Sequence, residues 1–205
     1  MLEPTPKTYH SSLYNGLLSV LVLASVIAGI VINGNRNIIS IIELSIYATT
    51  SLVLIVYISR REAPKEHDHR WWVIIVCWSS VLHVAFYEYP DVMNSWPVPC
   101  LITANIVGDI SVAYLRSSFS ILPARRIIRE GWLYGIVRHP IYATYIFADI
   151  YYVSLVPSIR NGAIATIGIA SFYIRARLEE SLLMKDSSYV VYAQRVRYRF
   201  FPGLM

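Results

Sequence analysis

Residues 138–142 read Arg-His-Pro-Ile-Tyr, and residues 175–180 read Arg-Ala-Arg-Leu-Glu-Glu. Between these two polar runs lie two apolar segments that are joined only by Pro157-Ser158. A chain that folds back at such a turn brings both polar runs to the same end of a helical hairpin. The sequence therefore predicts an α-helical hairpin with one polar site at its open end.

The composition is that of an integral membrane protein. Of the 205 residues, 56% are hydrophobic and only 15% are charged, and the mean hydropathy is +0.48, whereas soluble domains are about a quarter charged. The charges fall in clusters between apolar runs of membrane-spanning length, which predicts an all-α, polytopic membrane bundle. We expect one membrane domain over residues 1–205, with N-terminal transmembrane helices in 1–116 and the hairpin in 117–205.

Six apolar runs are candidate spans. They are Leu13–Ile32, Ile38–Ile58, Trp71–Tyr89, Val98–Leu115, Ile141–Val156 and Ile159–Tyr173. The first four approach the roughly twenty residues that cross the hydrocarbon core of a bilayer. The last two are shorter, so a five-span arrangement with one re-entrant segment remains an alternative.

The distribution of arginine and lysine orients these spans. Basic residues concentrate after the second and fourth spans and in the C-terminal region, whereas the opposite connections hold only Arg36 and Arg160. Because cytoplasmic loops carry the excess positive charge, both termini and the polar runs are expected on the cytoplasmic side. The mixed apolar and basic segment Ser117–Glu130 is expected along that interface. Basic residues placed there meet anionic lipid headgroups, so membrane lipids rather than nucleic acid are the expected partners.

The first polar run combines an arginine with a helix start. Pro140 suits the first turn of a helix, whose free N–H groups bind a carboxylate or phosphate. Arg138 adds a forked cationic donor next to His139, and Tyr142 and Tyr145 share one face of the helix. The alternative interpretation is a helix cap whose arginine reaches the lipid headgroups.

The second polar run pairs two carboxylates with two arginines. Arg175 precedes Glu179 by four residues and Arg177 precedes Glu180 by three, which permits intrahelical pairing. Adjacent helical residues point about 100° apart, so one glutamate can pair internally while the other faces a ligand ammonium or ribose. The alternative is a solvated, salt-bridged helix end.

The two runs, followed by Tyr189-x-x-Tyr192 and Arg199-Phe200-x-Pro202-Gly203, resemble in order and spacing the isoprenylcysteine carboxyl methyltransferase family. These integral-membrane enzymes use S-adenosylmethionine, and they have relatives among the phospholipid methyltransferases. The resemblance covers roughly Ser117–Gly203. The chain departs from the family in having Trp132-Leu133-Tyr134 where Gly-Pro-Tyr is frequent, and Thr144 where a glycine is common.

The resemblance implies that residues 117–205 form a catalytic region with S-adenosylmethionine at the cytoplasmic ends of the last two spans, under the C-terminal tail. It implies these catalytic residues: Arg138, His139, Arg175 and Glu180. It implies these cofactor-binding residues: Tyr134, Arg138, His139, Pro140, Tyr142, Glu179, Glu180, Tyr189, Tyr192, Phe200 and Pro202. No metal ligand is implied. The expected reaction transfers a methyl group to a lipophilic or lipid-attached acceptor, with a carboxylate favoured.

Two other functions remain as alternatives. One is an NADPH-dependent membrane sterol or steroid reductase, for which Arg125, Arg126 and Arg129 would suit a 2′-phosphate. The other is a small non-catalytic membrane protein.

Several polar residues lie away from the two runs. The acidic and histidine residues within the predicted spans either line a tunnel for the acceptor or form hydrogen bonds between helices; they are Glu43, His83, Asp109 and Asp149. The loop triplet His67-Asp68-His69 has the composition of a metal site but no further ligand nearby, so a solvated loop is expected.

Overall fold

The structure is a computed structural model that describes residues 66–68, 70–88, 98–115, 118, 123–125 and 127–204, together with Val20 and Ala24. Apart from those two residues, the predicted span Leu13–Ile32 lies outside the described part of the chain. So do the predicted span Ile38–Ile58 and Glu43.

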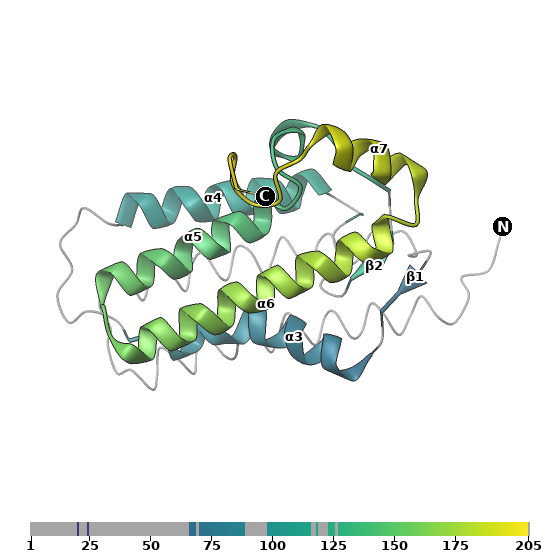
Figure 1. Ribbon diagram of the computed structural model, residues 1–205. Helices are drawn as coiled ribbons and strands as arrows, with labels where there is room; N and C mark the ends of the chain where they lie inside the picture. Colours follow the sequence, from purple (N-terminus) through teal and green to yellow (C-terminus); the bar gives the residue numbers. More distant parts are fainter. Residues whose placement is uncertain are drawn as a thin grey trace.

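The described residues are almost entirely helical (Figure 1). The helices are α3 (Trp71–Leu82), the 3-10 helix η1 (His83–Phe86), α4 (Val98–Leu115), the 3-10 helix η3 (Trp132–Gly135), α5 (Pro140–Leu155), α6 (Ile159–Leu183) and α7 (Ser187–Arg195). Two short strands, β1 (Glu66–His67) and β2 (Ala124–Arg125), pair antiparallel, with Glu66 opposite Arg125. The predicted all-α class is therefore confirmed.

Helix boundaries follow the predicted apolar runs, with differences in the third, fifth and sixth runs. α4 has the predicted bounds, and α5 begins one residue early because proline is well suited to the first helical position. The third run tightens into η1 at His83, and α6 continues past Tyr173 to Leu183. This extension consists mostly of good helix formers and contains no glycine or proline. Within the described ranges, none of the helices is both long and apolar enough to cross a membrane.

Four helices lie side by side in the order α4, α5, α6, α3 (Figure 1). The turn between α5 and α6 is fixed by Asn161, which is fully buried. Its side-chain amide donates to the carbonyl oxygens of Val156 and Glu88, and its Oδ1 accepts from the Glu88 N–H. The Ser158 hydroxyl caps α6 by accepting from the Asn161 N–H. Because every polar group of Asn161 is used, the hairpin turn and the residues after η1 form one unit.

A buried hydrogen-bonded pair joins α5 to η1. His83 Nε2 lies 2.8 Å from Asp149 Oδ1, and the Tyr87 hydroxyl donates to the same oxygen at 3.1 Å. Gly168 of α6 packs so closely that a Cβ there would lie 2.4 Å from His83 Nε2. The structure thus favours hydrogen bonds between helices for His83 and Asp149. Neither residue lines the apolar pocket described below.

Candidate functional site

The C-terminal segment lies against the loop that leads into α5. The Arg138 N–H donates to the carbonyl of Tyr198, and the His139 N–H donates to the carbonyl of Arg199, both at 2.9 Å. Arg138 Nη1 also donates to the Val196 carbonyl at 3.1 Å. The segment after α7 is therefore held at the N-terminal end of α5, within reach of the polar end of α6.

Glu180 is the centre of the polar cluster. It is 6% exposed and accepts hydrogen bonds from Arg138 Nε at 2.8 Å, His139 Nε2 at 3.2 Å and Arg199 Nη2 at 2.8 Å. Burial alone would raise the pKa of Glu180. The hydrogen bonds from His139 and Arg199 and the nearby positive charges outweigh burial, and they hold that pKa well below its usual range. Glu180 is therefore ionised, and it joins α6 to the loop before α5 and to the segment after α7.

Glu179 faces a different set of groups. The Tyr142 hydroxyl donates to its Oε1, and Arg175 Nε lies 3.6 Å from the same oxygen, which is the predicted pairing four residues apart. The other oxygen, Oε2, has His139 Nδ1 at 3.7 Å, beyond hydrogen-bond distance. Glu179 therefore keeps acceptor capacity that Glu180 has already used.

Arg175 is a buried cation. It is 4% exposed, its Nη1 donates to Ser80 Oγ of α3 at 3.2 Å, and its guanidinium lies 5.1 Å from the Tyr142 ring centroid. With Arg138 and Arg199, it makes three guanidinium groups around the two carboxylates of Glu179 and Glu180. With His139 neutral, the cluster has more positive than negative charge, so it suits an anionic group.

Aromatic rings extend the cluster along α5. The His139 and Tyr142 rings stack with 5.3 Å between centroids and 4° between planes, and Phe200 lies 6.0 Å from His139. Tyr142 and Tyr145 also contact Phe172 of α6, as expected for a shared helix face. The cluster is thus bounded by rings on the side of the helical core.

Three expected cofactor-binding tyrosines form a separate buried group beside α7. Tyr189 and Tyr192 pack together, and the Tyr192 hydroxyl donates to the carbonyl of Tyr134 at 2.7 Å. The Tyr134 hydroxyl reaches the Ser111 carbonyl at 3.4 Å. Burial raises the pKa of all three phenols, so they stay neutral hydrogen-bond donors. The hydroxyls of Tyr134 and Tyr192 already have protein acceptors. This group therefore holds α7 and the η3 region in place rather than offering its hydroxyls to a ligand.

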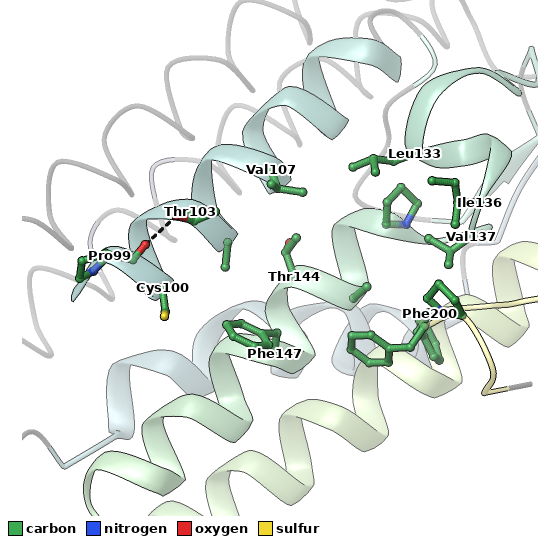
Figure 2. A pocket seen from close by; sticks show the side chains of 15 residues that line it. Pro99, Cys100, Thr103, Val107, Leu133, Ile136, Val137, Thr144, Phe147 and Phe200 are labelled. Atoms are coloured by element: carbon green, nitrogen blue, oxygen red, sulfur yellow. Dashed lines mark hydrogen bonds between the residues drawn. The ribbon is translucent and has the colours of Figure 1, made fainter. Parts of the chain in front are cut away.

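An apolar pocket of about 600 Å³ lies next to the polar cluster (Figure 2). It is lined by residues of α4, the η3 region, α5 and the C-terminal segment: Pro99, Cys100, Thr103, Ala104, Val107, Leu133, Ile136, Val137, Pro140, Ala143, Thr144, Phe147, Phe200, Phe201 and Pro202. Its two hydroxyls are satisfied within their own helices, Thr103 by the Pro99 carbonyl and Thr144 by the Ile141 carbonyl. The pocket therefore suits an occupant without polar groups.

The predicted site residues divide into three groups. The polar cluster brings together Arg138, His139, Tyr142, Arg175, Glu179 and Glu180. Pro140, Phe200 and Pro202 line the apolar pocket, and Tyr134, Tyr189 and Tyr192 form the group beside α7. The sequence did not predict a role for Arg199, although Arg199 belongs to the C-terminal motif. Nor did it predict that α4 lines the pocket, because α4 carries no motif.

Among the described residues, the remaining candidates lie outside the polar cluster and the pocket, and His69 and Arg126 fall outside the described part of the chain. Asp68 pairs with Arg70 at 2.6 Å; the Arg70 side chain is 55% exposed, but the Asp68 side chain is only 9% exposed, which is less than expected for a solvated loop. No group of three histidine, cysteine or acidic side chains in the described residues is arranged to hold a metal ion. Compared with protein-family models and with curated proteins, the chain matches none.

Proposed function

We propose that this protein is a membrane methyltransferase that transfers a methyl group from S-adenosylmethionine to a lipophilic or lipid-attached acceptor at the cytoplasmic interface. The observation that carries the proposal is a charged cluster with excess positive charge next to an apolar pocket whose two threonine hydroxyls are hydrogen-bonded within their own helices. A water-soluble, charged methyl donor and an apolar acceptor need two such sites side by side. The family resemblance supports the same assignment.

The exposed surface supports a membrane location. Large apolar side chains are exposed on successive helices, among them Ile75 of α3, Ile106 of α4, Ile150 of α5 and Ile167 of α6. Polar side chains such as Asp149 and Asn161 are buried between the helices. Apolar groups outside and polar groups inside are expected where lipid replaces water as the solvent. The excess of arginine and lysine places the polar cluster at the cytoplasmic side.

The polar groups fit the cofactor. S-adenosylmethionine supplies a methyl group on a sulfonium and carries a carboxylate and an ammonium. The excess positive charge of Arg138, Arg175 and Arg199 suits the carboxylate. Glu179 suits the ammonium, because among the described residues the neighbour seen at its Oε2 is His139 Nδ1 at 3.7 Å, whereas Glu180 accepts from three side chains.

Methyl transfer is an in-line displacement in which a bond from the acceptor to the methyl carbon forms as the carbon–sulfur bond breaks. A carboxylate acceptor is ionised at neutral pH and needs no base, so the protein orients the reactants and excludes water. A carboxylate also complements the excess positive charge of the cluster. His139 lies in the cluster with Nε2 3.2 Å from Glu180; the tautomer that donates through Nε2 offers Nδ1 as the base that an amine acceptor would need.

The proposal is tested by methyl transfer. Purified protein in lipid nanodiscs is incubated with S-adenosylmethionine labelled on the methyl group and a long-chain carboxylic acid. The labelled methyl ester is then extracted into organic solvent. We expect methyl transfer to the long-chain acid and little to acetate, and loss of transfer in Glu179→Gln but not in Arg177→Gln, whose side chain is exposed. Equal methylation of acetate would argue against the lipophilic pocket as the acceptor site.

A further inference from the structure

Residues 197–203, which we call the strap, cross the start of α5 after leaving α7. The strap forms a parallel bridge between Tyr198 and Val137, and the carbonyls of Tyr198 and Arg199 accept the Arg138 and His139 N–H groups. These main-chain bonds hold the strap to the loop before α5. They do not hold it to α6.

A side-chain pair supplies the link to α6. Arg199 Nη2 donates to Glu180 Oε2 at 2.8 Å, and Arg199 Nε donates to Oε1 at 3.1 Å, which is a bidentate arrangement. The Arg199 and Glu180 side chains are only 13% and 8% exposed, so water screens this pair less than a surface ion pair. Glu180 also accepts a hydrogen bond from Arg138, so one carboxylate of α6 holds both the strap and the loop before α5.

Phe200, which follows Arg199 in the strap, lies between the polar cluster and the apolar pocket. Phe200 lines the pocket together with Phe201 and Pro202 (Figure 2). The same Phe200 ring lies 6.0 Å from the His139 ring and 6.4 Å from the Tyr173 ring. The Phe200 ring therefore forms part of the wall between a group bound in the pocket and the charged groups around Glu180.

We propose that the strap is a gate held shut by the Arg199–Glu180 pair, and that Arg199 is a positioning residue that controls when the pocket and the polar cluster communicate. Direct transfer needs the acceptor atom and the methyl carbon in contact, so Phe200 must leave the space between them. Release of Arg199 from Glu180 is the step that frees Phe200, as in other loop-gated sites. The need for the strap to open rests on the proposed function, whereas the Arg199–Glu180 contact that holds the strap does not.

A cysteine in the pocket wall reports on the gate. Ala143 lines the pocket and is 9% exposed, so Ala143→Cys is made with Cys100→Ser, and its reaction rate with N-ethylmaleimide is measured in detergent. Adding Arg199→Ala should raise the rate about tenfold, the size expected for losing one charge-assisted hydrogen-bonded pair. Arg199→Lys should restore most of the protection, and Arg197→Ala, an exposed strap residue, should change nothing. An unchanged rate in folded Arg199→Ala protein would overturn the gate.

Hydrogen exchange provides a measurement without a reporter cysteine. The N–H groups of Arg138 and His139 are bonded to strap carbonyls, so Arg199→Ala should speed their exchange while Arg197→Ala does not. Equal protection in both variants would overturn the proposal. A gated pocket in a protein that does not bind S-adenosylmethionine would remove the enzyme assignment and keep the gate. Binding of S-adenosylmethionine by a protein whose pocket is equally reactive with and without Arg199 would keep the enzyme assignment and remove the gate.

Discussion

Glu179 and Glu180 are neighbours in sequence, yet their surroundings differ because adjacent helical residues point about 100° apart. Glu180 is turned toward the loop before α5 and the strap, and it accepts from Arg138, His139 and Arg199. Glu179 is turned toward Tyr142 and Arg175, and within the described part of the chain its other oxygen has His139 Nδ1 at 3.7 Å, beyond hydrogen-bond distance. One carboxylate therefore holds the protein together, and the other is available to a ligand.

The difference predicts unequal losses of stability. Glu180→Gln removes the anionic partner of two arginine side chains that are only 10% and 13% exposed, and it should lower the free energy of unfolding by about 3 kcal/mol, the lower end of the range for breaking a buried ion pair. Glu179→Gln keeps an acceptor for the Tyr142 hydroxyl and should cost about 1 kcal/mol. Chemical denaturation of the detergent-solubilised protein measures both. Similar losses in the two variants would refute this division of roles.

The depressed pKa of Glu180 predicts a contribution to acid stability. The unfolded carboxyl titrates near its ordinary pKa of about 4.3, so below that pH the unfolded state binds a proton that folded Glu180 does not. Stability from this group is therefore fully present above about pH 4.3 and is lost as the pH falls toward the lower folded pKa. Melting temperatures between pH 6 and pH 3 should fall less steeply in Glu180→Gln than in the unmodified protein. A parallel fall would contradict the assignment.

At the scale of elements, α6 fits its neighbours because of one glycine. Gly168 leaves room for the His83–Asp149 pair, since a Cβ there would lie 2.4 Å from His83 Nε2 and 2.7 Å from Asp149 Oδ2. Gly162, earlier in the same helix, has nothing within 4 Å of the corresponding position. The two glycines therefore provide a matched comparison within α6.

Alanine at the two positions should have opposite effects. Gly168→Ala should destabilise by roughly 1–3 kcal/mol, because the ring and the carboxylate have to move apart within a packed core. Gly162→Ala should be neutral or stabilising by up to about 1 kcal/mol, because alanine favours the helix. Thermal unfolding compares them directly. A loss of stability at Gly162 as large as at Gly168 would mean that the close approach does not matter.

The sequence predicted α5 and the start of α6 well because each apolar run has a clear start or turn, such as Pro140 or Pro157-Ser158, but it missed the end of α6, which continues from Tyr173 to Leu183 through charged residues. It also predicted that Arg138, His139 and Glu180 come together, since a hairpin returns its ends to one place. The sequence did not reveal the partner of Arg199. That contact depends on the path of the strap, which has no periodic pattern.

At the scale of the whole molecule, the described helices carry apolar residues outside and polar groups inside, and the proposed orientation puts the start of α4 on the outer side. Cys100 lies there and is exposed, whereas Cys77 is buried. A membrane-impermeant maleimide should therefore label intact cells at Cys100, and Cys100→Ser should abolish the labelling. Labelling only after the cells are opened would reverse the proposed orientation.

Calorimetric titration of the purified, detergent-solubilised protein with S-adenosylmethionine, with NADPH as control, tests the central claim most directly. We predict saturable binding of S-adenosylmethionine that is lost in Glu179→Gln, whose melting temperature falls by only about 2–4 °C, and no binding of NADPH. Binding of NADPH instead would favour a membrane reductase. Folded protein that binds neither ligand would contradict the enzyme assignment while leaving the helical fold in place.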